Sequence, residues 1–174
     1  RIVRIAGLAI SLFLPGLYVA LLLHHTHLIP LTLLLSIAET RADVPFTVLF
    51  EVLLMEFSFY LINEAGTRIP SQIGSTVSIV GALILGQAAV SASIISPILI
   101  ILVALTGLGS YAVPNYGFGL SIVVYRLLIV LTGALLGLYG LLAAALALLM
   151  HLCSIRSFGV PYLAPVAPKR PHNP

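Results

Sequence analysis

Charged residues are scarce in this sequence and unevenly distributed. Only 7% of the 174 residues are charged and 60% are hydrophobic, whereas about a quarter of the residues in soluble domains are charged. Residues 5–38, 69–125 and 127–155 contain no charged side chain. About 20 apolar helical residues cross the hydrocarbon core of a bilayer, so each stretch can hold at least one span. The composition excludes an ordinary soluble domain and predicts an integral membrane protein.

Cysteine and recognisable catalytic patterns are also lacking. Cys153 is the single cysteine, which excludes a disulfide framework and cannot make a metal site alone. The sequence contains no nucleophile elbow, phosphate-binding loop or two-histidine metal helix. His24, His25 and His27 would point in different directions on a helix, which argues against a metal site there. We therefore expect no enzyme activity, no cofactor and no metal.

The basic residues lie mainly at the two ends of the sequence. Arg1 and Arg4 precede the first uncharged stretch, and Arg156, Lys169 and Arg170 follow the last one. Basic flanks are typical of the cytoplasmic side of membrane spans. They form no basic face with interleaved aromatic residues, which argues against a nucleic-acid partner. If both ends face the same side, the number of complete crossings is even.

Apolar segments separated by turn residues predict an all-α, polytopic transmembrane bundle. The expected crossings are residues 5–23, 71–90, 94–113 and 121–151. An amphipathic helix at 46–64 is expected to be embedded without crossing fully; a fifth crossing is the alternative. The 121–151 segment would be about 46 Å long as a straight helix, which exceeds the hydrocarbon core, so we expect 119–126 to lie at the interface or against protein.

The sequence changes character after residue 153. Prolines recur every three or four residues from 161 to 174, a pattern typical of extended chain. We expect a transmembrane domain at 1–153 and a proline-rich extramembrane tail at 154–174.

The carboxylates are the most informative polar residues, because all 5 acidic residues lie between positions 39 and 64. A charge at the centre of a membrane helix costs about 2.5 to 3.5 kcal/mol, so it needs a reason to be there. On a helix, Glu56, Tyr60 and Asn63 share one face. One hypothesis is the wall of an ion path. The alternative is an interfacial helix whose carboxylates sit in water or pair with Arg41 and Arg68.

The candidate ion path comprises Glu51, Glu56, Tyr60, Asn63, Glu64 and Gln87. Gln87 is included because an amide within an uncharged run needs a hydrogen-bonding partner, either another helix or pore water.

Small residues recur at helical spacing in two of the apolar segments. Such stripes let helix backbones approach closely in lipid. We expect packing within one subunit, with oligomer contacts as the alternative. The helix-packing candidates are Gly74, Ser78, Ala82, Gly86, Gly133 and Gly137.

Several motifs resemble the A subunits of bacterial spore germination receptors, the GerA family. They occur in the family's order along nearly the whole chain: Arg-Ile-Ala-Gly-Leu-Ala-Ile-Ser-Leu-Phe-Leu-Pro-Gly from Arg4, Leu-Leu-Met-Glu from Leu53, Glu-Ala-Gly from Glu64 followed by Arg68, Gly-Gln-Ala-Ala-Val from Gly86, and Ser-Phe-Gly-Val-Pro-Tyr from Ser157. Related A-subunit-like proteins of the SpoVAF type share these motifs. The sequence departs from the family at Tyr60 and Asn63, where relatives tend to carry a Glu and an Arg.

The resemblance implies the membrane region of an A subunit, without the larger soluble portion that precedes it in the family. It also implies assembly with B and C subunits in the inner membrane of the bacterial spore. Nutrient recognition is associated mainly with the B subunit. The A subunit is thought to form a homo-oligomer that conducts monovalent cations, with membrane lipid around it.

Two other functions suit the same residues. Proline-broken helices and a membrane carboxylate are also found in secondary transporters, although no internal repeat is visible here. The small-residue stripes equally suit a non-conducting scaffold that anchors partners.

Overall fold

The computed structural model describes residues 2–68, 71–110, 116–157 and 160–161, and this part of the chain is helical apart from two very short strands. The predicted all-α fold is confirmed. The elements are α1 (Ile2–His24), the 3-10 turn η1 (Thr26–Leu28), α2 (Leu31–Thr40), α3 (Val48–Arg68), α4 (Ser71–Ser91), α5 (Pro97–Ser110), α6 (Tyr116–Ser154), β1 (Arg156–Ser157) and β2 (Val160–Pro161). The two strands pair antiparallel. Of the predicted tail, 158–159 and 162–174 lie outside the described residues.

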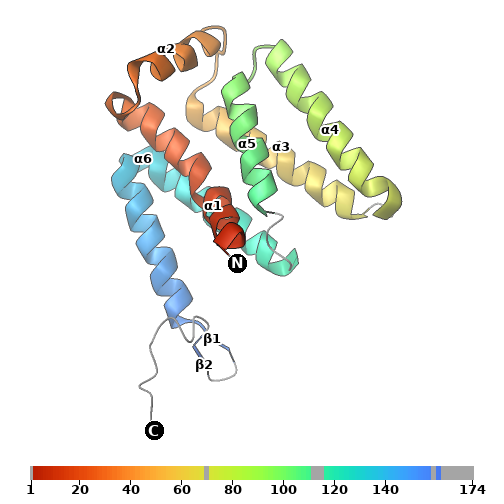
Figure 1. Ribbon diagram of the computed structural model, residues 1–174, viewed down its shortest axis with the longest axis vertical. Helices are drawn as coiled ribbons and strands as arrows, with labels where there is room; N and C mark the ends of the chain where they lie inside the picture. The colour runs from red at the N-terminus through yellow and green to blue at the C-terminus, as the bar shows by residue number, and fades with distance from the viewer. Residues whose placement is uncertain (1, 69–70, 111–115, 158–159, 162–174) are drawn as a thin grey trace.

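Helix α1 lies at the centre of the bundle, packed against α5 and α6 (Figure 1). The α1–α6 crossing is close because glycines face it from both sides. A Cβ atom on Gly133 would lie 2.9 Å from the carbonyl oxygen of Gly16, and one on Gly16 would lie 2.7 Å from Cγ2 of Ile129. The core beside this crossing is apolar; it contains Tyr18, Val19, Val52, Leu99, Val103 and Val130.

Helix α6 is broken at Gly137, which adopts φ 63° and ψ −141°. The part after the break folds back on the part before it: the rings of Tyr125 and His151 lie 6.0 Å apart. Leu141, Ala144 and Leu148 from the second half pack on Ile122 and Ile129 from the first and on Leu12 of α1. The late segment is therefore two helices, and its excess length is absorbed by the fold-back. Its crossing of the membrane stays a prediction, and Arg126, within the 119–126 part expected at the interface or against protein, is buried against protein.

The break also corrects the expected role of Gly137. We predicted a small residue within a packing stripe of one regular helix. A positive φ is a conformation that glycine adopts readily and other residues rarely do, and the ring of His25 packs against this position, 2.7 Å from where a Cβ atom would lie. Gly137 therefore makes the turn between two helices.

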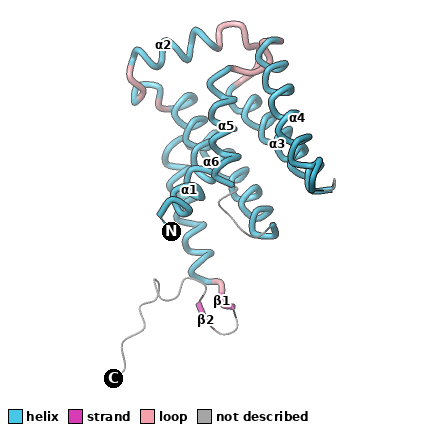
Figure 2. The backbone as a smooth tube through the Cα atoms, turned by 45° about the vertical axis from the view of Figure 1, so that its right-hand side comes forward, coloured by secondary structure: helices cyan, strands magenta, loops and turns pink. Residues whose placement is uncertain are grey.

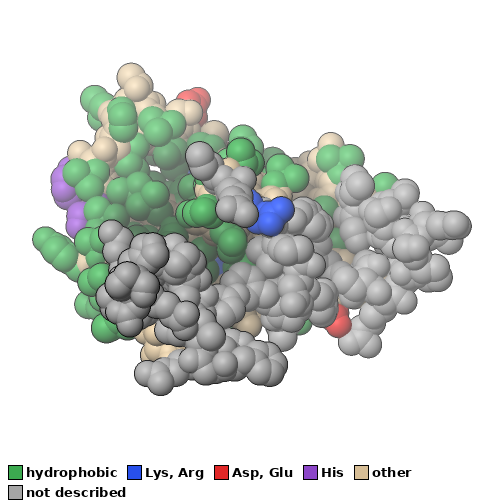
Figure 3. Space-filling model, turned by 60° about the horizontal axis from the view of Figure 1, so that its bottom comes forward, with side chains coloured by type: hydrophobic (Ala, Val, Ile, Leu, Met, Phe, Trp, Pro, Cys, Tyr) green, Lys and Arg blue, Asp and Glu red, His purple; other side chains and the backbone are tan. Residues whose placement is uncertain are grey.

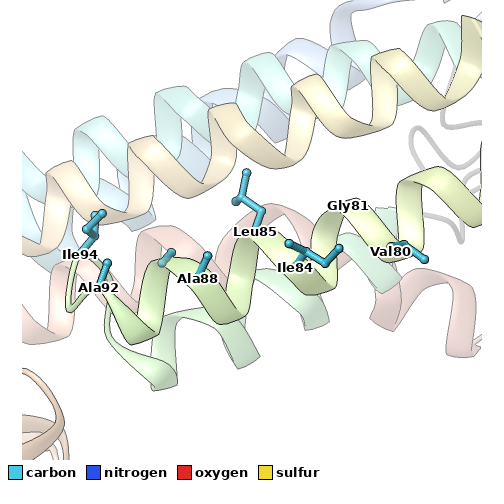
Figure 4. A pocket seen from close by; sticks show the side chains of 8 residues that line it. Val80, Gly81, Ile84, Leu85, Ala88, Ala92 and Ile94 are labelled. Carbon is cyan, nitrogen blue, oxygen red and sulfur yellow. The ribbon is translucent and has the colours of Figure 1, made fainter.

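Helices α3 and α4 pack side by side, and α4 makes most of its contacts with α3 (Figure 1, Figure 2). Helix α2 lies across the end of the bundle where α1 ends and α3 begins (Figure 2), and it buries only Ile37. An open apolar groove of about 920 Å³ runs along α4. Figure 4 shows its lining side chains, with Leu85 pointing toward α3.

The surface is rich in large apolar side chains and the interior contains charges. Leu135, Tyr139 and Met150 are 76%, 79% and 68% exposed. Many other Leu, Ile, Val and Phe side chains are also exposed to the surroundings. The face in Figure 3 is mostly hydrophobic where it is described, with isolated charged groups. Exposed apolar surface on this scale marks contact with lipid or protein.

Within the described part of the chain, two helices are long and apolar enough to cross a membrane, Val3–His24 and Ser121–Ser154. The second contains the Gly137 fold-back. Three shorter helices are also apolar, namely Leu31–Thr40, Val80–Ser91 and Pro97–Ser110. The total of four or five crossings stays a prediction.

Candidate functional site: two buried ion pairs on helix α3

Helix α3 carries two carboxylates that are turned into the bundle. Glu51 is fully buried, and Glu56 is 8% exposed. On the same helix Phe57 and Leu61 are 61% and 49% exposed. The buried face of α3 therefore combines two carboxylates with apolar side chains such as Val52 and Met55, while its outer face is apolar.

Glu51 joins three segments at one end of the bundle. Its Oε1 atom lies 2.6 Å from Nη2 of Arg41, in the connection between α2 and α3. Its Oε2 atom accepts a hydrogen bond of 3.2 Å from the backbone N–H of Ser96, directly before α5. The first N–H groups of a helix favour a nearby negative charge, so the start of α5 stabilises the carboxylate together with Arg41.

Glu56 joins three helices deeper in the bundle. Its Oε2 atom lies 2.8 Å from Nη2 of Arg126 on α6. Arg126 is 4% exposed, and its Nη1 atom donates a hydrogen bond of 3.4 Å to Oγ of Ser11 on α1. Arg126 is the one charged residue between positions 69 and 155. An unpaired charge in an apolar interior is strongly unfavourable, so each partner stabilises the other in this position.

Several buried polar atoms near these pairs lack a hydrogen-bond partner among the described residues. They are Glu56 Oε1, Arg41 Nη1 and Ser96 Oγ. Burying a polar group without a partner costs about 1–3 kcal/mol. Both ion pairs are thus only partly satisfied.

The other residues predicted for the ion path lie apart from the two pairs. Tyr60 and Glu64 are half-buried further along α3, and the side chain of Asn63 lies outside the described residues. Gln87 is exposed on α4 and lines a second groove, between α4 and the start of α5. The structure therefore brings Glu51 and Glu56 into the interior without Gln87.

The residues predicted to pack helices together also differ in their surroundings. Gly133 makes the close α1–α6 crossing, whereas a Cβ atom on Gly86 would meet Ile100 of α5 at an ordinary 3.6 Å. Ala82 is half-buried. The surroundings of Gly74 and the side chains of Ser78 and Arg68 lie outside what the structure describes.

Sequence reasoning missed the partner of Glu56. It considered Arg41 and Arg68 as partners for the carboxylates, and Arg41 lies beside Glu51. The partner of Glu56 is Arg126, supported by Ser11. A signal was present in the sequence, because a lone arginine within a long uncharged stretch needs a carboxylate from elsewhere.

Comparison with known proteins identifies the family. Residues 1–173 match the family described as Bacillus/Clostridium GerA spore germination protein. The chain belongs to the GerA family. It is 46% identical over 168 residues to spore germination protein KA and 43% identical over 165 residues to spore germination protein A1, both of Bacillus subtilis strain 168. The uncharacterized membrane protein YfkQ of the same organism is 40% identical over 168 residues.

These GerA relatives are longer than this chain. The matches cover 97%, 95% and 97% of this chain but only 31%, 34% and 33% of the respective relatives. The chain thus spans about a third of their length. No solved structure matches it.

Proposed function

We propose that this chain is a membrane subunit of a nutrient-responsive spore germination receptor in the spore inner membrane, where it oligomerises into a channel for monovalent cations. Assembly with B and C receptor subunits is part of the proposal. The observation that carries it is the burial of charged groups in a GerA-family bundle with an apolar surface: Glu51, Glu56 and Arg126 lie inside, and many large apolar side chains are exposed. Such a bundle suits lipid around it, and charged residues inside a membrane bundle often mark an ion pathway.

Helix α3 is the proposed polar wall of the ion path. It holds Glu51, Glu56, Tyr60 and Glu64, and carboxylates that line a pore attract cations. The membrane domain extends over 1–153 in this proposal, and 154–174 lie outside the bilayer.

Glu56→Gln tests the ion path because it removes a carboxylate while keeping the size of the side chain. We expect an altered rate of cation release during germination of spores that contain normal amounts of the protein. The matched control is Glu39→Gln, since Glu39 is exposed on α2, and it should leave the rate unchanged. Normal release in Glu56→Gln spores would count against a pore role for α3.

A non-conducting scaffold is the second candidate. It is favoured by the pairing of both buried carboxylates with arginines, which cancels their charge. Purified protein that binds B and C subunits but gives no conductance in planar bilayers would decide for the scaffold.

A further inference from the structure

We propose that the two ion pairs form a latch that holds α3 against the rest of the bundle, and that α3 releases both when the protein opens. The latch consists of Arg41–Glu51 and Glu56–Arg126. The opening step rests on the proposed function, because it assigns the latched arrangement to the closed state of the ion path.

The placement of the charges supports a latch on α3. Both carboxylates belong to α3, whereas both arginines lie outside it, one before the helix and one on α6. Glu51 also accepts a hydrogen bond from the backbone N–H of Ser96, and Arg126 also donates one to the hydroxyl of Ser11. Between the two pairs α3 contributes the apolar side chains of Val52 and Met55, which make no polar link. The two pairs thus connect α3 to α1, α5, α6 and the α2–α3 connection.

Incomplete hydrogen bonding makes the latched state reversible. Glu56 Oε1, Arg41 Nη1 and Ser96 Oγ are buried without hydrogen-bond partners in the described part of the chain. Water would satisfy these atoms once α3 moved away, and each charged group would regain hydration. Hydration of these groups therefore offsets part of the free energy that breaking the ion pairs costs. A fully satisfied network would hold α3 more rigidly.

The surroundings of α4 leave room for the movement. Helix α4 packs mainly on α3, and an open groove of about 920 Å³ runs along it, lined by small side chains such as Gly81, Ala88 and Ala92 (Figure 4). The turn after α4 contains Ser93 at φ 51°, a conformation that a non-glycine residue rarely adopts. A shift of α3 would carry α4 with it, and it would separate Val52 and Met55 from the apolar core that they share with α1, α5 and α6.

Labelling of a buried cysteine tests the latch without relying on ion conduction. Val52 is 0% exposed on α3, so Val52→Cys in a Cys153→Ser background should react slowly with a charged thiol reagent in native membranes. In the same background, Arg126→Gln should raise the labelling rate at least about tenfold, which is about 1.4 kcal/mol less free energy for opening. The charge swap Glu56→Arg with Arg126→Glu should return the rate to within about threefold of the parent.

Two controls keep the labelling test decisive. Arg4→Gln removes an exposed arginine and should leave the rate unchanged. If Arg126→Gln protein does not accumulate, Arg41→Gln takes its place, because it breaks the other pair at a position that is already 16% exposed. An unchanged rate in the accumulating variant, or a swap that labels as fast as the single variant, overturns the latch.

Ion release from spores of the same strains separates the latch from the proposed channel. Release without nutrient in Arg126→Gln spores, suppressed by the swap, supports both. Faster labelling in Arg126→Gln that the swap restores, in a protein that never conducts, supports the latch and overturns the channel. Nutrient-dependent conduction with unchanged labelling in all variants overturns the latch alone.

Discussion

The α1–α6 crossing gives a sharp prediction about the small-residue stripes, because its glycines are not equivalent to those of α4. In Gly133→Ala the new methyl group would lie 2.9 Å from the carbonyl oxygen of Gly16. That oxygen belongs to the backbone of α1, so relief requires the two helices to separate. In Gly86→Ala the nearest atom is Cδ1 of Ile100 at 3.6 Å, an ordinary contact with a flexible side chain.

The two substitutions differ mainly in packing, because both replace a helical glycine by alanine. Each gains about 0.5–1 kcal/mol from alanine's higher helix propensity. Overpacking at the crossing costs about 1–3 kcal/mol. The propensity gain cancels in the comparison, so Gly133→Ala should be less stable than Gly86→Ala by about 1–3 kcal/mol.

Thermal unfolding in detergent micelles, followed by circular dichroism, measures this difference. At about 2–4 °C per kcal/mol for a chain of this length, Gly133→Ala should unfold roughly 2–12 °C below Gly86→Ala. Equal midpoints, or a higher midpoint for Gly133→Ala, would refute the close backbone crossing.

Two further predictions concern the fold-back and the deeper ion pair. Gly137→Ala should lower stability by about 1–2 kcal/mol, because alanine is strained at φ 63°; Gly81→Ala, with no atom within 4 Å of its new methyl group, is the matched control in the same unfolding assay, and equal stabilities would contradict the break. Glu56→Leu and Arg126→Leu should each cost about 3–5 kcal/mol, whereas the double variant should lie within about 1–2 kcal/mol of the parent, because an apolar pair replaces a buried ion pair at little cost. Additive losses in this double-mutant cycle would show that the two residues do not interact.

The helices were largely predictable because they depend on local pattern. The segment at 46–64 became α3 (Val48–Arg68), and 71–90 became α4 (Ser71–Ser91). Prolines and glycines marked the ends, since the residue before a proline avoids helical backbone. These signals lie within a few residues of the boundary that they set.

The fold-back in α6 was not predictable from the same local signals. Gly133, Gly137 and Gly140 have the spacing of a packing stripe, and the sequence around them is continuously apolar. What distinguishes Gly137 is tertiary: His25 packs against it, and Leu141 packs on the first half of α6. Such contacts between distant segments override local helix propensity.

The sequence predicts that the buried carboxylates need partners, but it does not predict which residue pairs with Glu56. The cost of burying a carboxylate says that Glu56 needs a partner, but the partner lies on a helix far along the sequence. Arg41 is near Glu51 in the sequence, and the short connection between α2 and α3 limits where it can reach. Arg126 has no such restraint, so its pairing depends on how α6 packs.

The fold-back bears on how α3 sits in the membrane. Because α6 returns on itself at Gly137, its two ends lie toward the same side of the bundle (Figure 1), so we expect it to contribute no net crossing. If both basic ends of the chain share one side, the remaining crossings are even in number, and the crossings predicted at 5–23, 71–90 and 94–113 alone make an odd number. Helix α3 has 21 residues, about 31 Å of helix, which is long enough to cross.

We therefore expect α3 to cross the membrane fully instead of lying embedded. Figure 1 places the start of α3 and the turn after α4 at one end of the bundle, opposite the end of α6. In intact vesicles, Ala42→Cys and Ala92→Cys, each in a Cys153→Ser background, should react with an impermeant thiol reagent from one side of the membrane. The native Cys153, which is exposed, should react only from the other. Labelling of Ala42→Cys and Ala92→Cys from opposite sides would leave α3 short of a crossing, and would remove its carboxylates from any path through the bilayer.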